Sequence, residues 1–136
     1  LMSTILKVGT LDVVFVDYGQ LLKPSTKRGE LRHEISDIYE GLRGMAGELA
    51  LPIWTAHQAN RVGTVTRTLL PEHIAEDFNA VAIADIGISI NQTDEERRSG
   101  TLRLYNMLSR IGPSGFQVDC NVNWETSCMS VATDDL

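Results

Sequence analysis

Three polar residues stand where segments of regular structure are expected to end, and their side chains suit phosphate chemistry. Asp17 and Gln58 each follow a short apolar run, and Arg110 precedes a Gly-Pro turn. An aspartate can hold Mg²⁺ through its water shell, and a glutamine can donate to a phosphate oxygen while accepting from a water. An arginine on a rigid hairpin can be presented outward, to stabilise charge on a transferring phosphoryl group. Together these residues indicate hydrolysis of a nucleoside triphosphate.

Each of these residues also has a plainer interpretation, which the sequence leaves open. A strand-terminal aspartate can simply start a turn, and an arginine beside a hairpin turn is commonly an ordinary surface residue. His57 could replace Gln58 as the polar sensor, although a histidine at a strand end is more often a packed, hydrogen-bonded side chain.

An α/β arrangement must position these residues. The uninterrupted apolar run Val13 to Val16 predicts a buried strand, and apolar residues spaced by three and four predict a helix over residues 31–50. Pro52 ends that helix, and a second strand is expected over residues 53–56. Strand, helix and strand imply a right-handed parallel crossover, which places Asp17 and Gln58 at neighbouring carboxyl ends of one sheet. The helix contains glycines 41, 44 and 47, which we expect to permit close packing on another element.

The sequence pattern of the rest of the chain predicts mostly strands. Loop composition over residues 61–70 precedes a short helix near residues 71–80, and residues 84–90 predict a third strand. The charged run within residues 93–100 is expected to be an exposed turn. Residues 102–108 and 116–122 predict a hairpin, with a last strand within residues 125–131.

Composition limits the possible partners. The 136 residues carry a net charge of −6, with eight Lys and Arg against seven Asp and Glu in residues 1–68, and four against eleven in residues 69–136. A polyanion would therefore have to bind at a local basic patch. The candidates are the loop residues Lys23, Lys27, Arg28 and Arg32, and the pair Arg61 and Arg67. Solvated surface charge is the commoner explanation for both groups.

Several other classes of protein lack support in this sequence. No signal peptide, membrane span or repeat is apparent, so we expect a cytoplasmic protein that makes no membrane contact. The two cysteines, Cys120 and Cys128, are expected to be reduced structural thiols rather than zinc ligands. Neither G-x-S-x-G nor G-x-G-x-x-G occurs, and the phosphate-binding G-x-x-x-x-G-K-[ST] loop is also absent.

Four segments taken in order resemble the RecA-like motor domain of DnaB-type replicative helicases. They are VVFVDYGQLL, LPIWTAHQANR, IAEDFNAVAIADIGISI and LSRIGPSG, and the resemblance covers about residues 10–120. In that family they match the Walker B strand, the strand with the γ-phosphate sensor, the DNA-facing loop with its following strand, and the finger hairpin. The order of four motifs is more specific than any one of them.

The resemblance implies a role for each matching residue. Asp17 would be the Walker B acid that holds Mg²⁺ through water, Gln58 the γ-phosphate sensor, and Arg110 the arginine finger that reaches a neighbouring subunit's nucleotide. Arg61 and Arg67 would lie near the site or contact DNA. The cofactors would be ATP, or another NTP, and Mg²⁺. The partners would be single-stranded DNA and further copies in a ring, expected to be a hexamer.

Some positions depart from the family pattern. Leu108 replaces a lysine before the finger, Ala75 replaces a basic residue of the DNA loop, and Phe78 replaces a glycine. We therefore expect nucleotide sensing in trans and the DNA contacts of that loop to differ from the family pattern.

The family's Walker A loop and catalytic glutamate lie upstream of the Walker B strand, and this chain contains neither. We therefore expect residues 1–136 to form one partial RecA-like ATPase domain that does not hydrolyse ATP alone. In RecA-like sheets the Walker A strand lies between the sensor strand and the strand at residues 84–90, so we expect the chain to close this gap or to pair edges with a second copy. The alternatives are a RecA-fold ATPase of recombinase or clock-protein type, and a non-enzymatic oligomerisation module.

Overall fold

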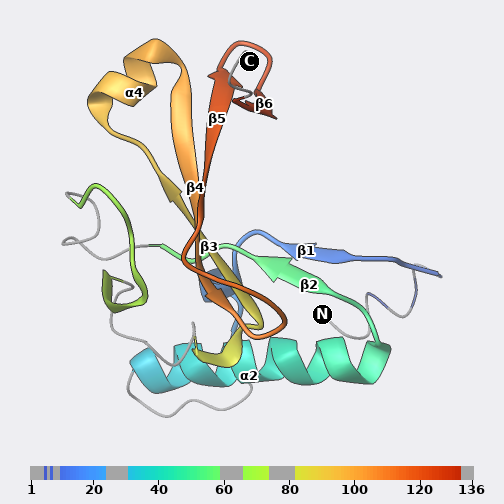
Figure 1. The fold of residues 1–136 in the computed structure, drawn as a ribbon. Helices are drawn as coiled ribbons and strands as arrows, with labels where there is room; N and C mark the ends of the chain where they lie inside the picture. Colours follow the sequence, from blue (N-terminus) through green and yellow to red (C-terminus); the bar gives the residue numbers. More distant parts are fainter. Residues whose placement is uncertain are drawn as a thin grey trace.

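The chain forms two small sheets, one parallel and one antiparallel (Figure 1). The computed structural model describes residues 5, 7, 10–23, 31–58, 66–73 and 82–132.

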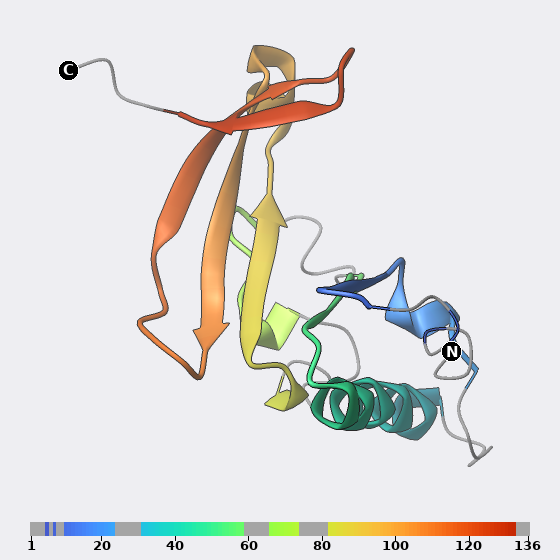
Figure 2. The ribbon, with the colours of Figure 1, turned by 90° about the vertical axis from the view of Figure 1, so that its right-hand side faces the viewer.

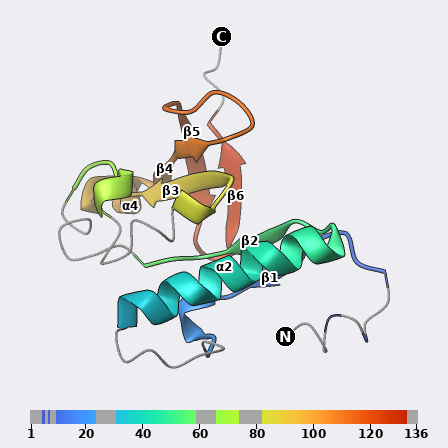
Figure 3. The same cartoon turned by 90° about the horizontal axis from the view of Figure 1, so that it is seen from below.

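The parallel sheet is a strand pair that packs on one long helix. Strand β1 (Val14–Val16) pairs in parallel with β2 (Ile53–Thr55), and between them lie the 3-10 turn η1 (Gly19–Leu21) and helix α2 (Leu31–Leu49). Seen from below, α2 runs along this pair (Figure 3). The predicted strand–helix–strand crossover is therefore confirmed.

The core lies between α2 and the strand pair. Helix spacing places Ile38, Leu42 and Met45 on one buried face, where they pack with Val16 and Ile5. Burying each such side chain contributes about 1.5–3 kcal/mol. This packing holds the end of β1 firmly against the helix.

The opposite face of the strand pair is open. Phe15 and Trp54 are cross-strand partners on it, and they are 74% and 46% exposed. Parallel sheets are normally covered on both faces. The strand pair therefore presents an aromatic surface that no described part of this chain covers.

The second half of the chain forms the antiparallel sheet, which stands away from α2 in Figure 2. Its strands follow the order β3-β4-β5-β6. The elements are β3 (Ile86–Asn91), α4 (Asp94–Ser99), β4 (Thr101–Ser109), β5 (Gln117–Asn123) and β6 (Cys128–Val131). The predicted hairpin and last strand are confirmed, and Cys120 and Cys128 are free thiols.

The charged run was wrongly expected to be a turn, because it forms helix α4. The Thr93 hydroxyl accepts from Glu96 N, while the Glu96 carboxylate accepts from Thr93 N. This reciprocal cap satisfies two backbone donors at the start of the helix. Gly100 ends the helix with φ of 72°, a left-handed conformation that glycine adopts readily.

The three glycines of α2 do not serve close packing. A Cβ added at Gly41, Gly44 or Gly47 would meet nothing within 4 Å among the described residues. The expectation of an element packed closely against them is therefore wrong for the part of the chain that the structure describes.

The predicted helix near residues 71–80 is described only at its start, as the 3-10 turn η3 (Pro71–His73). Residues 74–80, including Ala75 and Phe78, lie outside the described residues. The structure therefore tests only the first turn of the predicted helix, which is a 3-10 turn.

No strand that the structure describes fills the expected gap between β2 and β3. Strand β2 pairs only with β1, and β3 pairs only with β4, among the strands that the structure describes. The first alternative of this expectation, closure by the chain itself, is therefore not found among the described strands. Pairing with a second copy stays a prediction.

Candidate active site at the ends of β1 and β2

The parallel pair brings the predicted acid and amide to neighbouring strand ends. Val16 is the register partner of Thr55, so both strands finish at the same edge of the sheet. Asp17 follows β1 directly and Gln58 follows β2 after two intervening residues, and both side chains are exposed. The predicted placement is confirmed, whereas the roles of the two residues stay predictions.

A glycine allows the chain to turn closely against β2 after Asp17. The backbone N–H of Gly19 donates to the Thr55 hydroxyl at 2.8 Å. A Cβ on Gly19 would lie 3.1 Å from that oxygen and 3.2 Å from the Tyr39 hydroxyl. A side chain at position 19 would therefore push the turn away from β2 and α2.

Gln58 is tied to the segment that follows Asp17. Its backbone N–H donates to Gln20 Oε1 at 3.2 Å, and its Nε2 donates to the Tyr18 hydroxyl at 3.4 Å. Gln58 is therefore bonded to the turn that begins at Asp17, so the amide and the carboxylate do not lie on two independent loops. A ligand that moved Gln58 would also act on the turn beside Asp17.

His57 is a packed, hydrogen-bonded side chain, as its plainer interpretation predicted. Gln20 Nε2 lies 3.5 Å from His57 Nε2, and an amide nitrogen only donates, so the ring accepts there and carries its proton on Nδ1. Nδ1–H then donates to the Tyr39 hydroxyl at 2.8 Å. The hydroxyl in turn donates to the Ala56 carbonyl at 3.3 Å. Helix α2 thus supports the polar end of β2.

Arg110 lies at the end of β4, but its side chain folds back onto its own chain. Its Nε donates to the Ala84 carbonyl at 3.1 Å, and its Nη2 donates to the Ala82 carbonyl. The guanidinium is exposed yet held at the segment before β3, so the expected outward presentation is not what this structure shows. Reaching another subunit would require Arg110 to release these carbonyls.

A second arginine binds the same segment from α2. Arg43 Nη1 donates to Asp85 Oδ1 at 3.0 Å and also to the Ile83 carbonyl. Both side chains of this ion pair are about half exposed, so it contributes little stability alone. It does bring the start of β3 against the helix that supports His57.

The residues present fit part of a nucleotide site. One exposed carboxylate beside an amide suits Mg²⁺ held through water and a terminal phosphate, because Mg²⁺ keeps several waters and takes few carboxylates. The sequence offers no glycine-rich loop with lysine for the remaining phosphates. Asp17 and Gln58 would therefore hold the metal and γ-phosphate side only.

The family model for the DnaB-like helicase C terminal domain matches residues 2–72, just over half of the chain. The chain belongs to the DnaB-like helicase C-terminal domain family. The match includes both strands of the candidate site.

Curated relatives agree with the DnaB-like assignment. Probable plasmid replicative DNA helicases from Chlamydia trachomatis and Chlamydia muridarum are 46% and 48% identical over 56 and 52 residues, or 40% and 38% of this chain. The aligned region spans only 12% and 11% of their lengths.

Two solved structures share the fold. One is an ATPase domain with a TM-score of 0.84 at 22% identity, over 94% of this chain and 49% of that one. The other, a DnaB-like replicative helicase studied with its primase interactions, has a TM-score of 0.80 at 21% identity, over 90% and 32%. The predicted RecA-like fold is therefore confirmed. Separately, no helix among the described residues is long and apolar enough to cross a membrane.

One departure from the DnaB-like pattern, Leu108, lies opposite a glycine in the antiparallel sheet. Leu108 pairs with Gly87 across the β3–β4 ladder, next to an irregularity in the register. A Cβ on Gly87 would lie 3.3 Å from Leu108 Cβ. Leu108 therefore lies over a position where a side chain larger than that of glycine would crowd it.

The two predicted DNA contacts have different outcomes. Arg61 lies outside the described residues. The side chain of Arg67 is exposed, and its carbonyl accepts from Arg103 Nη2 at 2.7 Å. Neither position tests a contact with DNA.

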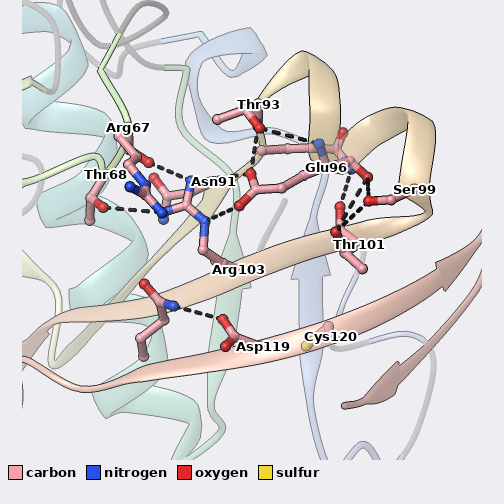
Figure 4. A network of polar contacts seen from close by, with 12 residues as sticks. Arg67, Thr68, Asn91, Thr93, Glu96, Ser99, Thr101, Arg103, Asp119 and Cys120 are labelled. Carbon is pink, nitrogen blue, oxygen red and sulfur yellow. Dashed lines mark hydrogen bonds and ion pairs between the residues drawn. The ribbon is translucent and has the colours of Figure 1, made fainter.

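Sequence reasoning missed the polar network around Arg103, which Figure 4 shows. It joins α4, β3 and β4 to the segment at residues 67–69. One signal was available, because Thr93 and Glu96 form the T-x-x-E pattern of a helix cap. The other partners of Arg103, the Arg67 carbonyl and the Thr68 hydroxyl, carry no comparable local signal.

Proposed function

We propose that this chain is the part of a DnaB-like replicative helicase motor that reads the γ-phosphate and couples ATP hydrolysis to DNA unwinding in the complete protein. The observation that carries the proposal is that Asp17 and Gln58 follow adjacent parallel strand ends, with Gln58 hydrogen-bonded to Tyr18 and Gln20 of the turn after Asp17. The named replicative helicases from Chlamydia, at 46% and 48% identity, support the helicase class over other RecA-fold ATPases.

Each residue has a defined task in this proposal. Bound ATP with Mg²⁺ would supply the phosphate to be cleaved and neutralise its charge. Asp17 would accept hydrogen bonds from the metal's waters. Gln58 would donate from Nε2 to a phosphate oxygen and accept a hydrogen bond from a water at Oε1, exchanging its contact with Tyr18 for the ligand. Arg110 would leave its own carbonyls and donate to a neighbouring subunit's nucleotide in a ring.

The chain alone is expected not to hydrolyse ATP, because its sequence lacks the phosphate-binding loop. The test therefore joins this chain to the P-loop-bearing half of a DnaB-like ATPase domain. Mg²⁺-dependent ATP hydrolysis is then measured with and without single-stranded DNA. We expect Gln58→Ala to lower the turnover about 100-fold, the usual effect of losing a donor aimed at developing charge.

A matched pair of aspartates makes the test specific. Asp17→Asn should abolish Mg²⁺-dependent turnover, whereas Asp12→Asn, an exposed aspartate just before β1, should leave it unchanged. Equal activity of Asp17→Asn and the parent would contradict the proposal. ATPase activity that single-stranded DNA does not stimulate, without strand displacement, would favour the recombinase or clock-protein class.

A non-enzymatic oligomerisation module is the second candidate. The observation that favours it is Leu108, which packs on Gly87 where the family has a lysine. It predicts that neither Asp17→Asn nor Gln58→Ala has any effect in the joined protein. The cytoplasmic setting and the ring stay predictions under both candidates.

A further inference from the structure

Two polar residues of β3 hold a backbone segment from outside the sheet. Ser89 and Asn91 alternate on one face of the strand, and each is only 4% exposed. Leu69 N–H donates to Asn91 Oδ1 at 2.7 Å, and the Ser89 hydroxyl donates to the Leu69 carbonyl at 3.0 Å. Asn91 Nδ2 donates to Ser89 Oγ at 2.9 Å, which fixes the orientation of both side chains. Both backbone groups of Leu69 are therefore bound.

Arg103 holds the two preceding residues. Arg103 is 7% exposed, and its guanidinium reaches from β4 to the same segment (Figure 4). Nη2 donates to the Arg67 carbonyl at 2.7 Å, and Nη1 donates to the Thr68 hydroxyl at 3.3 Å. Residues 67, 68 and 69 are therefore each bound by a buried polar side chain of the sheet.

Glu96 balances the buried charge of Arg103. Arg103 Nε donates to Glu96 Oε1 at 2.7 Å, and Nη2 donates to Oε2 at 3.2 Å. This two-pronged contact fixes the plane of the guanidinium. The same carboxylate caps α4 through Thr93, so the helix start, the arginine and the segment form one network. Hydrogen bonds that satisfy a buried guanidinium in this way restrict the geometry of the groups that it contacts.

The segment held in this way carries an exposed cation. The Arg67 side chain is exposed although its carbonyl is bound, and residues 49–71 contain Arg61 and Arg67 but no Asp or Glu. In a chain with a net charge of −6, this is a local place for a polyanion. A fixed backbone reduces the entropy lost when a flexible arginine binds a phosphate.

We propose that Arg103, balanced by Glu96, is a positioning residue that fixes Arg67 for contact with a phosphate of single-stranded DNA. The proposal depends on the proposed function for the identity of this partner. Arg103 itself touches no ligand, because it is buried beneath the segment that it holds.

The test measures binding of fluorescein-labelled oligo-dT to the 136-residue chain by fluorescence anisotropy over a range of salt concentrations. Arg67→Ala should weaken binding severalfold and reduce the magnitude of the salt slope by about 0.7, the value for one phosphate contact on a single strand. Arg103→Lys keeps the charge but cannot reach Glu96, the Arg67 carbonyl and Thr68 together. It should reproduce the loss and the slope change of Arg67→Ala.

The double variant separates positioning from a structural effect. Arg67→Ala with Arg103→Lys should bind no more weakly than Arg67→Ala alone, because both changes remove the same contact. Arg97→Ala, at an exposed arginine of α4, should leave binding unchanged. Glu96→Gln keeps the shape of the side chain and should show a partial loss, which guards against a folding defect in Arg103→Lys.

Several results would overturn the proposal. One is a lowered melting temperature of Arg103→Lys with unchanged binding, and another is additive losses in the double variant. Equal binding by Arg67→Ala and the parent, or no binding by the parent at low salt, would also overturn it. Failure of the proposed function is recognised by a different measurement, because it would appear as unchanged ATP hydrolysis by Asp17→Asn in the joined protein.

Discussion

The Tyr39 hydroxyl lies 2.8 Å from His57 Nδ1, so helix α2 is bonded to the residue that precedes Gln58. Tyr39 is 8% exposed, and its hydroxyl also donates to the Ala56 carbonyl. The helix that forms the core with β1 thus also supports the polar end of β2.

Tyr39→Phe should lower the free energy of unfolding by about 1–2 kcal/mol, because it removes a buried hydroxyl with two hydrogen bonds. Urea denaturation of the 136-residue chain measures this. Tyr18→Phe is the matched control, because its hydroxyl accepts only a longer, exposed bond from Gln58 and should cost much less. An equal loss in both variants would show that the bond to His57 has no special importance.

Two glycine substitutions should change stability in opposite directions. Gly44→Ala should raise the free energy of unfolding by about 0.5–1 kcal/mol, because Gly44 is exposed in the middle of α2 and a Cβ there meets nothing. Gly19→Ala should lower it by about 1–3 kcal/mol, because its Cβ would crowd Thr55 and Tyr39. Thermal melts of both variants test the pair, and a destabilised Gly44→Ala would reveal a contact on that face of the helix.

The contribution of Glu96 to stability should depend on pH. Its hydrogen bonds from Arg103, and then from the Thr93 backbone, lower the pKa of this carboxyl below its ordinary value of 4.5. A lowered folded pKa stabilises the native state above the ordinary value, and this contribution is lost as pH falls through the folded value. The melting temperature of the parent should exceed that of Glu96→Gln at neutral pH, and the difference should shrink below about pH 4.5. A difference independent of pH would mean that the ionised carboxylate is not what stabilises the fold.

The unpaired strand edges predict self-association through a second copy. Strands β2 and β3 each have a partner on one side only among the described strands, and Phe15 and Trp54 are exposed beside them. Sedimentation velocity should show a mass that rises with concentration. Phe15→Lys should weaken this association, whereas Ile111→Lys, at an exposed residue after β4, should not. A monomer at every concentration would contradict the prediction.

The sequence by itself determined the elements whose signals are local. The apolar run before Asp17, the spacing of Ile38, Leu42 and Met45, and Pro52 after the helix predict β1, α2 and β2 nearly to their observed bounds. A strand–helix–strand connection is typical of parallel neighbours, so the meeting of Asp17 and Gln58 was predictable. Helix α4 was missed because its charged residues show no apolar periodicity, and the cap formed by Thr93 and Glu96 was not recognised.

Only the tertiary structure decided which distant groups meet. Arg103 binds the backbone of a residue 36 positions earlier, and Arg110 binds carbonyls 26 and 28 positions earlier. Propensity and hydrophobic periodicity act between near neighbours in sequence, whereas these hydrogen bonds depend on how packed elements bring backbone groups within reach. Arg103 lies within β4, where it is buried and supports residues 67–69. Arg110 follows the end of β4, so its guanidinium is exposed even though it binds two backbone carbonyls.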